Sequence, residues 1–330
     1  MKKQLIAAAV AATVSAAALA DISITGAAQV NYTNVDNAGA TPDTNKFTQE
    51  TSLKIVGKSG DTEVVIGLGG SGFDAGSNDD TGASTSDARV NVEDLYMTTK
   101  IGDVSIKSGA WDNGNNELRA SGRNAGKFQA TTSVGAINLG FLTSSAGASA
   151  EEFTVGTSLG GVDVSFTQKN SGETVKASTT MGGVSVKYLG LPSDSTTSDK
   201  SYVELSTKVG DLGIKVGQAK ADASVAIEGD TWMGDFETNR SDADTGGAYD
   251  LVDGQDVTTV ELKTAVAGNT VTFRNTKIDG VAGADTDFNK FIVTRSLTSG
   301  ATFEATYTAL DSATDSEDTD TLDLELRVNF

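Results

Sequence analysis

Hydrophobic and polar residues alternate with a period of two along most of this chain. The final run places Leu322, Leu324, Leu326, Val328 and Phe330 on one face and Asp323, Glu325, Arg327 and Asn329 on the other. The pattern recurs at residues 22–32, 104–107, 162–167, 184–188, 271–274 and 302–307. It predicts β-strands with one apolar and one polar face. No stretch of eleven or more residues has the 3.6-residue period of a helix, so we expect an all-β fold.

The connections between these runs discriminate between two all-β architectures. Alternation fits a soluble sandwich, whose apolar faces pack together, and a membrane barrel, whose apolar face meets lipid. Short connections rich in Gly and Asn, which adopt positive φ in tight hairpins, lie at 59–61, 102–103, 135–136, 160–161, 182–183, 210–211, 267–269 and 299–300. Longer polar and acidic connections lie at 34–46, 69–87, 111–126, 191–200, 221–255, 279–287 and 311–320. Short periplasmic turns that alternate with longer outer loops are typical of bacterial outer-membrane barrels.

The turn count sets the size of the predicted barrel. Eight hairpins plus one strand at each end give a transmembrane antiparallel up-and-down β-barrel of 18 strands. Sixteen strands is the alternative, because strand boundaries are hard to place from sequence. No segment has about 20 consecutive apolar residues, so no spanning helix is expected. Residues 21–330 form one domain, because a closed barrel has no internal boundary.

The first 20 residues have the pattern of an export signal. Lys2 and Lys3 precede an Ala-rich apolar run, and Ala18-Leu19-Ala20 fits a small-x-small cleavage site. The run is too short and too rich in alanine to cross about 30 Å of hydrocarbon well, which argues against a membrane anchor. We therefore expect residues 1–20 to be a cleaved signal peptide.

Composition argues against several functions. The chain has no Cys and no His, which removes disulfides, the commonest general base and the commonest metal ligand. No motif marks a Ser-Lys pair or a carboxylate dyad, so we expect no enzyme, and this includes barrels with protease or phospholipase activity. The net charge of −20, or −22 without Lys2 and Lys3, argues against nucleic acid as a partner. The acidic excess either solvates the surface or attracts cations, and the sequence leaves both open.

Four features resemble the Gram-negative outer-membrane porins. The chain ends in Phe330, like the terminal aromatic residue that porin-like barrels present to their assembly machinery. Residues 21–26 (DISITG) resemble the first strand of general diffusion porins. Residues 91–106 (NVEDLYM to IGDVSI) resemble the hairpin before the third porin loop, and residues 123–141 (RNAGKFQ, then GAINLGF) resemble the segment after it. The layout covers residues 21–330, whereas the specific motifs cover about 91–141.

The resemblance implies a water-filled outer-membrane channel for passive diffusion of small polar solutes and ions. It implies a homotrimer in contact with lipid and lipopolysaccharide, and no cofactor. In porins a loop folds into the barrel and places acids opposite basic wall residues. Carried over, the acids are Asp112 and Glu117, and the bases are Lys107, Arg119, Arg123 and Lys127. Strand parity adds Lys54, Lys263 and Arg274 to the polar face. Alternatively, Arg119 and Arg123 are ordinary surface residues of a loop.

Two departures from the porin pattern affect the expected pore. Connection 111–126 is shorter than the usual constriction loop, and connection 221–255 is longer. The strand count exceeds the common sixteen by one hairpin, which we place at residues 174–188. The pore is therefore expected to be wider, or to be narrowed by a different loop.

The acidic connections set the expected ion preference. Connection 221–255 contains nine acids and one base, Arg240. Neither it nor 311–320 has EF-hand spacing, so weak bridging of divalent cations to lipopolysaccharide phosphates fits better than a specific calcium site. Acids around a pore mouth raise the local cation concentration, so a cation-preferring channel is expected, unless the wall bases set the narrowest point. The alternative to a channel is an exported soluble β-rich adhesin or surface-layer protein.

Overall fold

The computed structural model describes residues 21–38, 42–71, 91–112, 123–145, 151–169, 172–191, 199–221, 256–279, 285–312 and 318–330. These residues form 18 strands: β1 (Asp21–Asn37), β2 (Thr44–Ser59), β3 (Thr62–Ser71), β4 (Asn91–Ile101), β5 (Val104–Asp112), β6 (Arg123–Val134), β7 (Ile137–Ser144), β8 (Glu151–Leu159), β9 (Val162–Lys169), β10 (Gly172–Met181), β11 (Val184–Leu191), β12 (Lys200–Val209), β13 (Leu212–Ala221), β14 (Asp256–Val266), β15 (Asn269–Asp279), β16 (Thr286–Ser296), β17 (Ala301–Ser312) and β18 (Thr319–Asn329). No helix among them is long and apolar enough to cross a bilayer.

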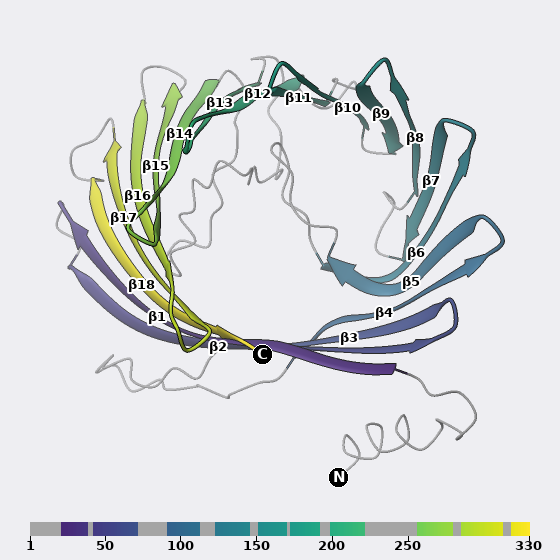
Figure 1. The fold of residues 1–330 in the computed structure, drawn as a ribbon, viewed down its shortest axis with the longest axis horizontal. Coiled ribbons are helices and arrows are strands. Elements are labelled where there is room, and N and C mark those ends of the chain that lie inside the picture. The colour runs from purple at the N-terminus through teal and green to yellow at the C-terminus, as the bar shows by residue number, and fades with distance from the viewer. Residues whose placement is uncertain are drawn as a thin grey trace, which may run out of the picture.

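The strands form one closed antiparallel sheet. Each strand pairs with its neighbours in sequence, and β1 also pairs with β18. Figure 1 shows the resulting ring, in which β18 ends on β1. Closure leaves no strand edge unpaired, which is how an antiparallel sheet satisfies its backbone without a second sheet. The predicted 18-stranded up-and-down barrel is confirmed, and the sixteen-stranded alternative is wrong.

The short turns gather at one end of the barrel. All eight predicted turns join consecutive strands, and each contains a glycine with positive φ, from 56° at Gly60 to 85° at Gly161. Ala267, at φ 49°, is the single non-glycine residue with positive φ among the described residues. Asp21 pairs with Lys58 and Phe330 pairs with Gly26, so β1 begins and β18 ends at this short-turn end.

The connections at the opposite end differ in part from the prediction. Those between β7 and β8 and between β9 and β10 were not predicted, because they are short and carry no acidic run. The predicted connection 34–46 is too long, since β1 continues to Asn37 and β2 begins at Thr44. Hydrogen bonds of 2.8 Å from Tyr32 Oη and Asn34 Nδ2 to Asn45 Oδ1 join the two strands there. A polar segment therefore continues as a β-strand where its side chains form hydrogen bonds with those of the neighbouring strand.

The register keeps side chains of one parity together around the barrel. Leu324 lies opposite Tyr32 and Ala305, Phe273 lies opposite Leu262 and Phe291, and Ile55 lies opposite Ile24 and Ile66. Large apolar residues of this parity are exposed, among them Ile24, Leu95, Phe153, Leu205 and Phe291. In a closed barrel the two parities face outward and inward. An exposed apolar outer face fits contact with lipid, whereas a sandwich would bury its apolar faces between two sheets.

The inner face is mostly polar and is cross-linked between strands. Ion pairs of 2.9 Å join Lys58 to Glu63 and Lys169 to Glu152. Thr154 and Thr167 share a hydrogen bond of 2.8 Å. Such cross-strand pairs stabilise a sheet by a few tenths to about 1 kcal/mol each. The inner wall therefore combines charge with limited side-chain freedom.

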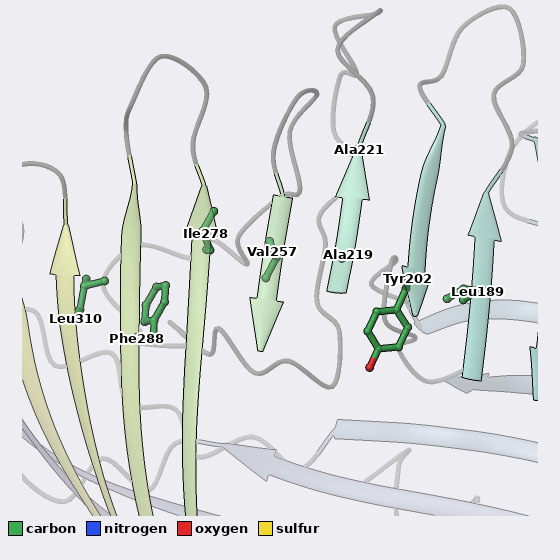
Figure 2. Packing of buried hydrophobic residues seen from close by; sticks show 8 residues of the cluster. All are labelled: Leu189, Tyr202, Ala219, Ala221, Val257, Ile278, Phe288 and Leu310. Atoms are coloured by element: carbon green, nitrogen blue, oxygen red, sulfur yellow. The ribbon is translucent and has the colours of Figure 1, made fainter. Parts of the chain in front are cut away.

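One part of the inner face is apolar. It comprises Leu189, Tyr202, Ala219, Ala221, Val257, Ile278, Phe288 and Leu310, which we call the inner apolar row. Figure 2 shows these residues on neighbouring strands from β11 to β17, toward the end opposite the short turns. Tyr202 pairs with both Leu189 and Ala219, and Leu189 and Tyr202 are each only 1 % exposed. Strand parity predicted polar residues on this face, and at these strand ends that prediction is wrong because the alternation is reversed: the inner positions are apolar, and the outer positions include Lys220, Asp256, Asp279, Asp287 and Asp311.

Candidate channel wall

The charges on the inner face define the candidate site. Its basic residues are Lys46, Lys54, Lys58, Lys100, Lys107, Lys127, Lys169, Lys176, Lys187, Lys200, Lys208, Lys215, Lys263, Arg274, Lys290 and Arg327. Its acidic residues are Asp21, Glu50, Glu63, Glu93, Asp94, Glu152, Asp163, Glu204, Glu261, Glu304, Asp323 and Glu325. Bases outnumber acids on the described wall although the whole chain carries −20. The acidic excess of the protein therefore does not come from this wall.

The predicted pore residues differ in accessibility. Lys54 on β2 and Lys263 on β14 are exposed on the inner face, and Lys107 on β5 is partly exposed. Lys127 on β6 is on the same face but is only 2 % exposed. Arg274 on β15 is paired with an acid. The register places each of these residues on the parity opposite the exposed apolar residues, whereas their covering by neighbours does not follow from the sequence pattern.

Four predicted residues cannot be placed as side chains. Asp112 ends β5 and pairs in register with Arg123 at the start of β6, but the description of both stops at the backbone. Glu117 and Arg119 lie outside the described residues. Their proposed role at a constriction stays a prediction.

Lys107 lies in an aromatic corner on β4 and β5. Its Nζ is 4.0 Å from the ring centroid of Tyr96 and 4.4 Å from that of Trp111. The two rings meet edge to face with centroids 6.1 Å apart. An ammonium over an aromatic face gains about 0.5–2 kcal/mol, depending on its exposure. Lys54 and Lys127 add repulsion and Asp94 adds attraction at this ammonium.

A register shift beside this corner explains the burial of Lys127. The pairing of β5 with β6 shifts between Gly109 and Trp111, where Gly126 has a φ of 71°. A bulge of this kind interrupts the ladder and turns the strand. Lys127 Nζ donates a hydrogen bond of 2.8 Å to the Trp111 carbonyl oxygen and lies 5.3 Å from the Trp111 ring. Lys127 therefore supports Trp111, and its charge is largely withdrawn from the interior.

A second charged group spans β12 to β15. Lys215 lies 3.9 Å from Glu204 and 4.0 Å from Glu261, and Arg274 Nε donates to Glu261 at 3.0 Å. Tyr202 Oη donates to Glu204 at 2.5 Å, which joins the inner apolar row to the charges. Opposite charges compensate each other here, so this part of the wall contributes little net field.

A third group, on β17, β18, β1 and β2, is acidic. Glu304 and Glu325 are paired directly across β17 and β18. Like charges in this position destabilise a sheet slightly. Thr294 Oγ1 donates to Glu304 at 2.9 Å, and Gln29 Nε2 donates to Glu50 at 3.0 Å. The sequence could not identify this group, because it depends on the register between strands far apart in the chain.

Acidic residues also mark the outer face at the long-connection end. Asp256 pairs with Asp279, Asp287 pairs with Asp311, and Asp320 pairs with Asp36. All share the parity of the exposed apolar residues and lie at strand ends. Among the described residues no group of three or more Asp, Glu, His or Cys is placed to hold a metal ion.

Comparisons with known proteins agree at the level of the fold. No family model matches the chain, and no curated protein matches it in sequence. Three similar solved structures are Pseudomonas aeruginosa OccK9 (OpdG), with 13 % identity and a TM-score of 0.66, OccK5 (OpdH), with 13 % and 0.64, and OpdL, with 11 % and 0.64. Each comparison covers 94 % of this chain, and 98, 98 and 99 % of the respective solved chain. At these identities the likeness shows a shared fold.

Proposed function

We propose that this protein is an outer-membrane channel for passive diffusion of small polar solutes and ions. The observation that carries the proposal is a closed barrel whose outer face is apolar and exposed and whose inner face is charged. A closed barrel satisfies its backbone within hydrocarbon, and a polar interior of this strand number leaves room for water. A soluble adhesin or surface-layer protein would not keep residues such as Phe291 and Leu205 in contact with solvent.

Export and outer partners belong to the same proposal. Residues 1–20 direct export and are removed, and three copies of the chain assemble in the membrane. The outer-face acids at the long-connection end, including Asp279, Asp287 and Asp320, support weak bridging of divalent cations to lipopolysaccharide phosphates. No catalytic residue or cofactor is needed for passive diffusion.

The proposed cation preference arises at the mouth of the channel. The described wall carries more bases than acids, so a preference for cations has to come from the acidic connections. Fields from exposed charges are screened within about 8–10 Å at physiological salt. We therefore expect cation preference at low ionic strength and its decline as salt rises.

Reconstitution into planar bilayers tests the proposal. Purified protein should give stepwise conductance, and a KCl gradient should give a reversal potential of the cation-preferring sign that shrinks at higher mean salt. An anion-preferring reversal at low salt would show that wall bases such as Lys54 and Lys263 dominate. Absence of conductance from protein that resists unfolding on unheated gels would contradict the channel itself.

A further inference from the structure

The surroundings of Lys107 indicate a role for two aromatic residues that the general porin pattern does not assign. Lys107, Gly109 and Trp111 follow one another on the inner face of β5, and Tyr96 on β4 pairs with Gly109. Gly109 has a φ of 137°, and a Cβ there would collide with the Leu95 carbonyl oxygen and with Tyr96. Glycine therefore allows β5 to lie this close to the β4 backbone beside Tyr96.

The two rings restrict where the Lys107 charge can lie. A free lysine side chain has four rotatable bonds and about 2 kcal/mol of rotamer entropy. Here the ammonium is 4.0 and 4.4 Å from the two ring centroids, against the wall. Trp111 is only 4 % exposed, so its indole has little room to move, and Lys127 holds the Trp111 backbone through its carbonyl oxygen.

We propose that Tyr96 and Trp111 are positioning residues that hold the Lys107 ammonium back against the channel wall and thereby limit its effect on passing ions. The proposal rests on the channel function proposed above. Lys107 is the partly exposed base of this corner, so a change in its position changes the field in the interior. The rings act through Lys107 and have no role in selectivity without it.

The proposal predicts shifts of opposite sign for two kinds of variant. Lys107→Met removes the charge and should shift the reversal potential in a KCl gradient toward cations. Tyr96→Leu and Trp111→Leu release the ammonium toward the pore axis and should shift it toward anions. A unit charge brought from about 8 to about 4 Å in unscreened water changes the permeability of a cation and of an anion by about twofold each, in opposite directions, and so changes their ratio by about sixfold.

Three further variants separate positioning from general damage. Tyr96→Phe keeps the ring and should behave as the wild type. Phe288→Leu removes a ring from the inner apolar row on β16, away from Lys107, and should leave selectivity unchanged. The double variant Trp111→Leu/Lys107→Met should have the selectivity of Lys107→Met alone, because the ring acts through the lysine.

The readouts distinguish the possible failures. If Trp111→Leu does not fold, Tyr96→Leu and Tyr96→Phe still test the ring at a partly exposed position. Unchanged selectivity in Tyr96→Leu, or a shift in the direction of Lys107→Met, would overturn the positioning role. Wild-type protein without conductance would instead overturn the channel function.

Discussion

Gly26 and Phe330 meet at the seam where the barrel closes. Gly26 N donates to Phe330 O at 2.7 Å, and Phe330 N donates to Gly26 O at 2.9 Å. A Cβ on Gly26 would lie 2.6 Å from Phe330 Cζ and 2.8 Å from the Ser52 carbonyl oxygen. The ring thus rests on a position that only glycine leaves open, while Phe330 remains 63 % exposed on the outer face.

Gly26→Val should therefore destabilise the barrel. Forced overpacking costs about 1–3 kcal/mol, which lowers the urea midpoint of the folded protein in detergent. Gly57→Val is the matched control. Gly57 on β2 lies on the outer face, as Gly26 on β1 does, and a Cβ added at Gly57 would have no other atom within 4 Å. Equal urea midpoints for the two valine variants would contradict specific packing of Phe330 on Gly26.

Phe330→Asp should reduce assembly into the outer membrane.

Residue-level features were only partly predictable from sequence. The register places Lys54, Lys107, Lys263 and Arg274 on the parity opposite the exposed apolar residues, as alternation in the sequence predicts, and their role in the pore stays a prediction. It could not give the burial of Lys127 or the aromatic corner, because both depend on a register shift between β5 and β6. Alternation fixes which face a side chain is on, whereas its contacts depend on the neighbouring strand.

The last hairpin shows the two faces most clearly at the level of an element. On β17 and β18, Phe303 pairs with Leu326 on the outer face, and Thr302 pairs with Arg327 on the inner face. Regular alternation of this kind made the strands and their turns predictable. The connections after β7 and β9 were missed because local composition does not separate a short outer connection from a strand.

Arginine substitutions should distinguish the two faces. Leu324→Arg, Leu326→Arg or Phe303→Arg should cost about 2–4 kcal/mol near the bilayer midplane, because the guanidinium meets hydrocarbon. Thr302→Arg and Glu325→Arg should be mild and should alter conductance instead. Unfolding in lipid vesicles measures the first effect and planar-bilayer recording the second. Equal destabilisation by arginine on both faces would contradict the assignment of one face to lipid and the other to the lumen.

Closure of the barrel is a property of the whole molecule that the sequence indicates only indirectly. The layout of turns predicts a barrel, but the pairing of β1 with β18 is visible only in the structure. Gly26 and Phe330 exchange two hydrogen bonds, so Gln29 and Arg327, three positions along, form a non-hydrogen-bonded pair. Their Cα atoms are expected about 4.5 Å apart, within the range that a disulfide can join.

A cross-link can therefore test closure in a chain that has no cysteine of its own. Gln29→Cys/Arg327→Cys should oxidise readily in folded protein and should prevent separation of the seam on heating. Asn31→Cys/Arg327→Cys is displaced by two residues on the same face and should oxidise poorly. Efficient cross-linking of the displaced pair would indicate a different register, and failure of both would indicate an open sheet.

The seam also has a consequence for the order in which the barrel folds. Every other pairing joins strands adjacent in sequence, whereas Gly26 and Phe330 are roughly 300 residues apart. The loop entropy of that one contact exceeds that of a typical hairpin by about 2–3 kcal/mol, since the cost grows with the logarithm of length. The β1–β18 pairing is therefore expected to form late. Until then β1 and β18 present unpaired edges that can pair with other chains, so aggregation competes with closure in this last step.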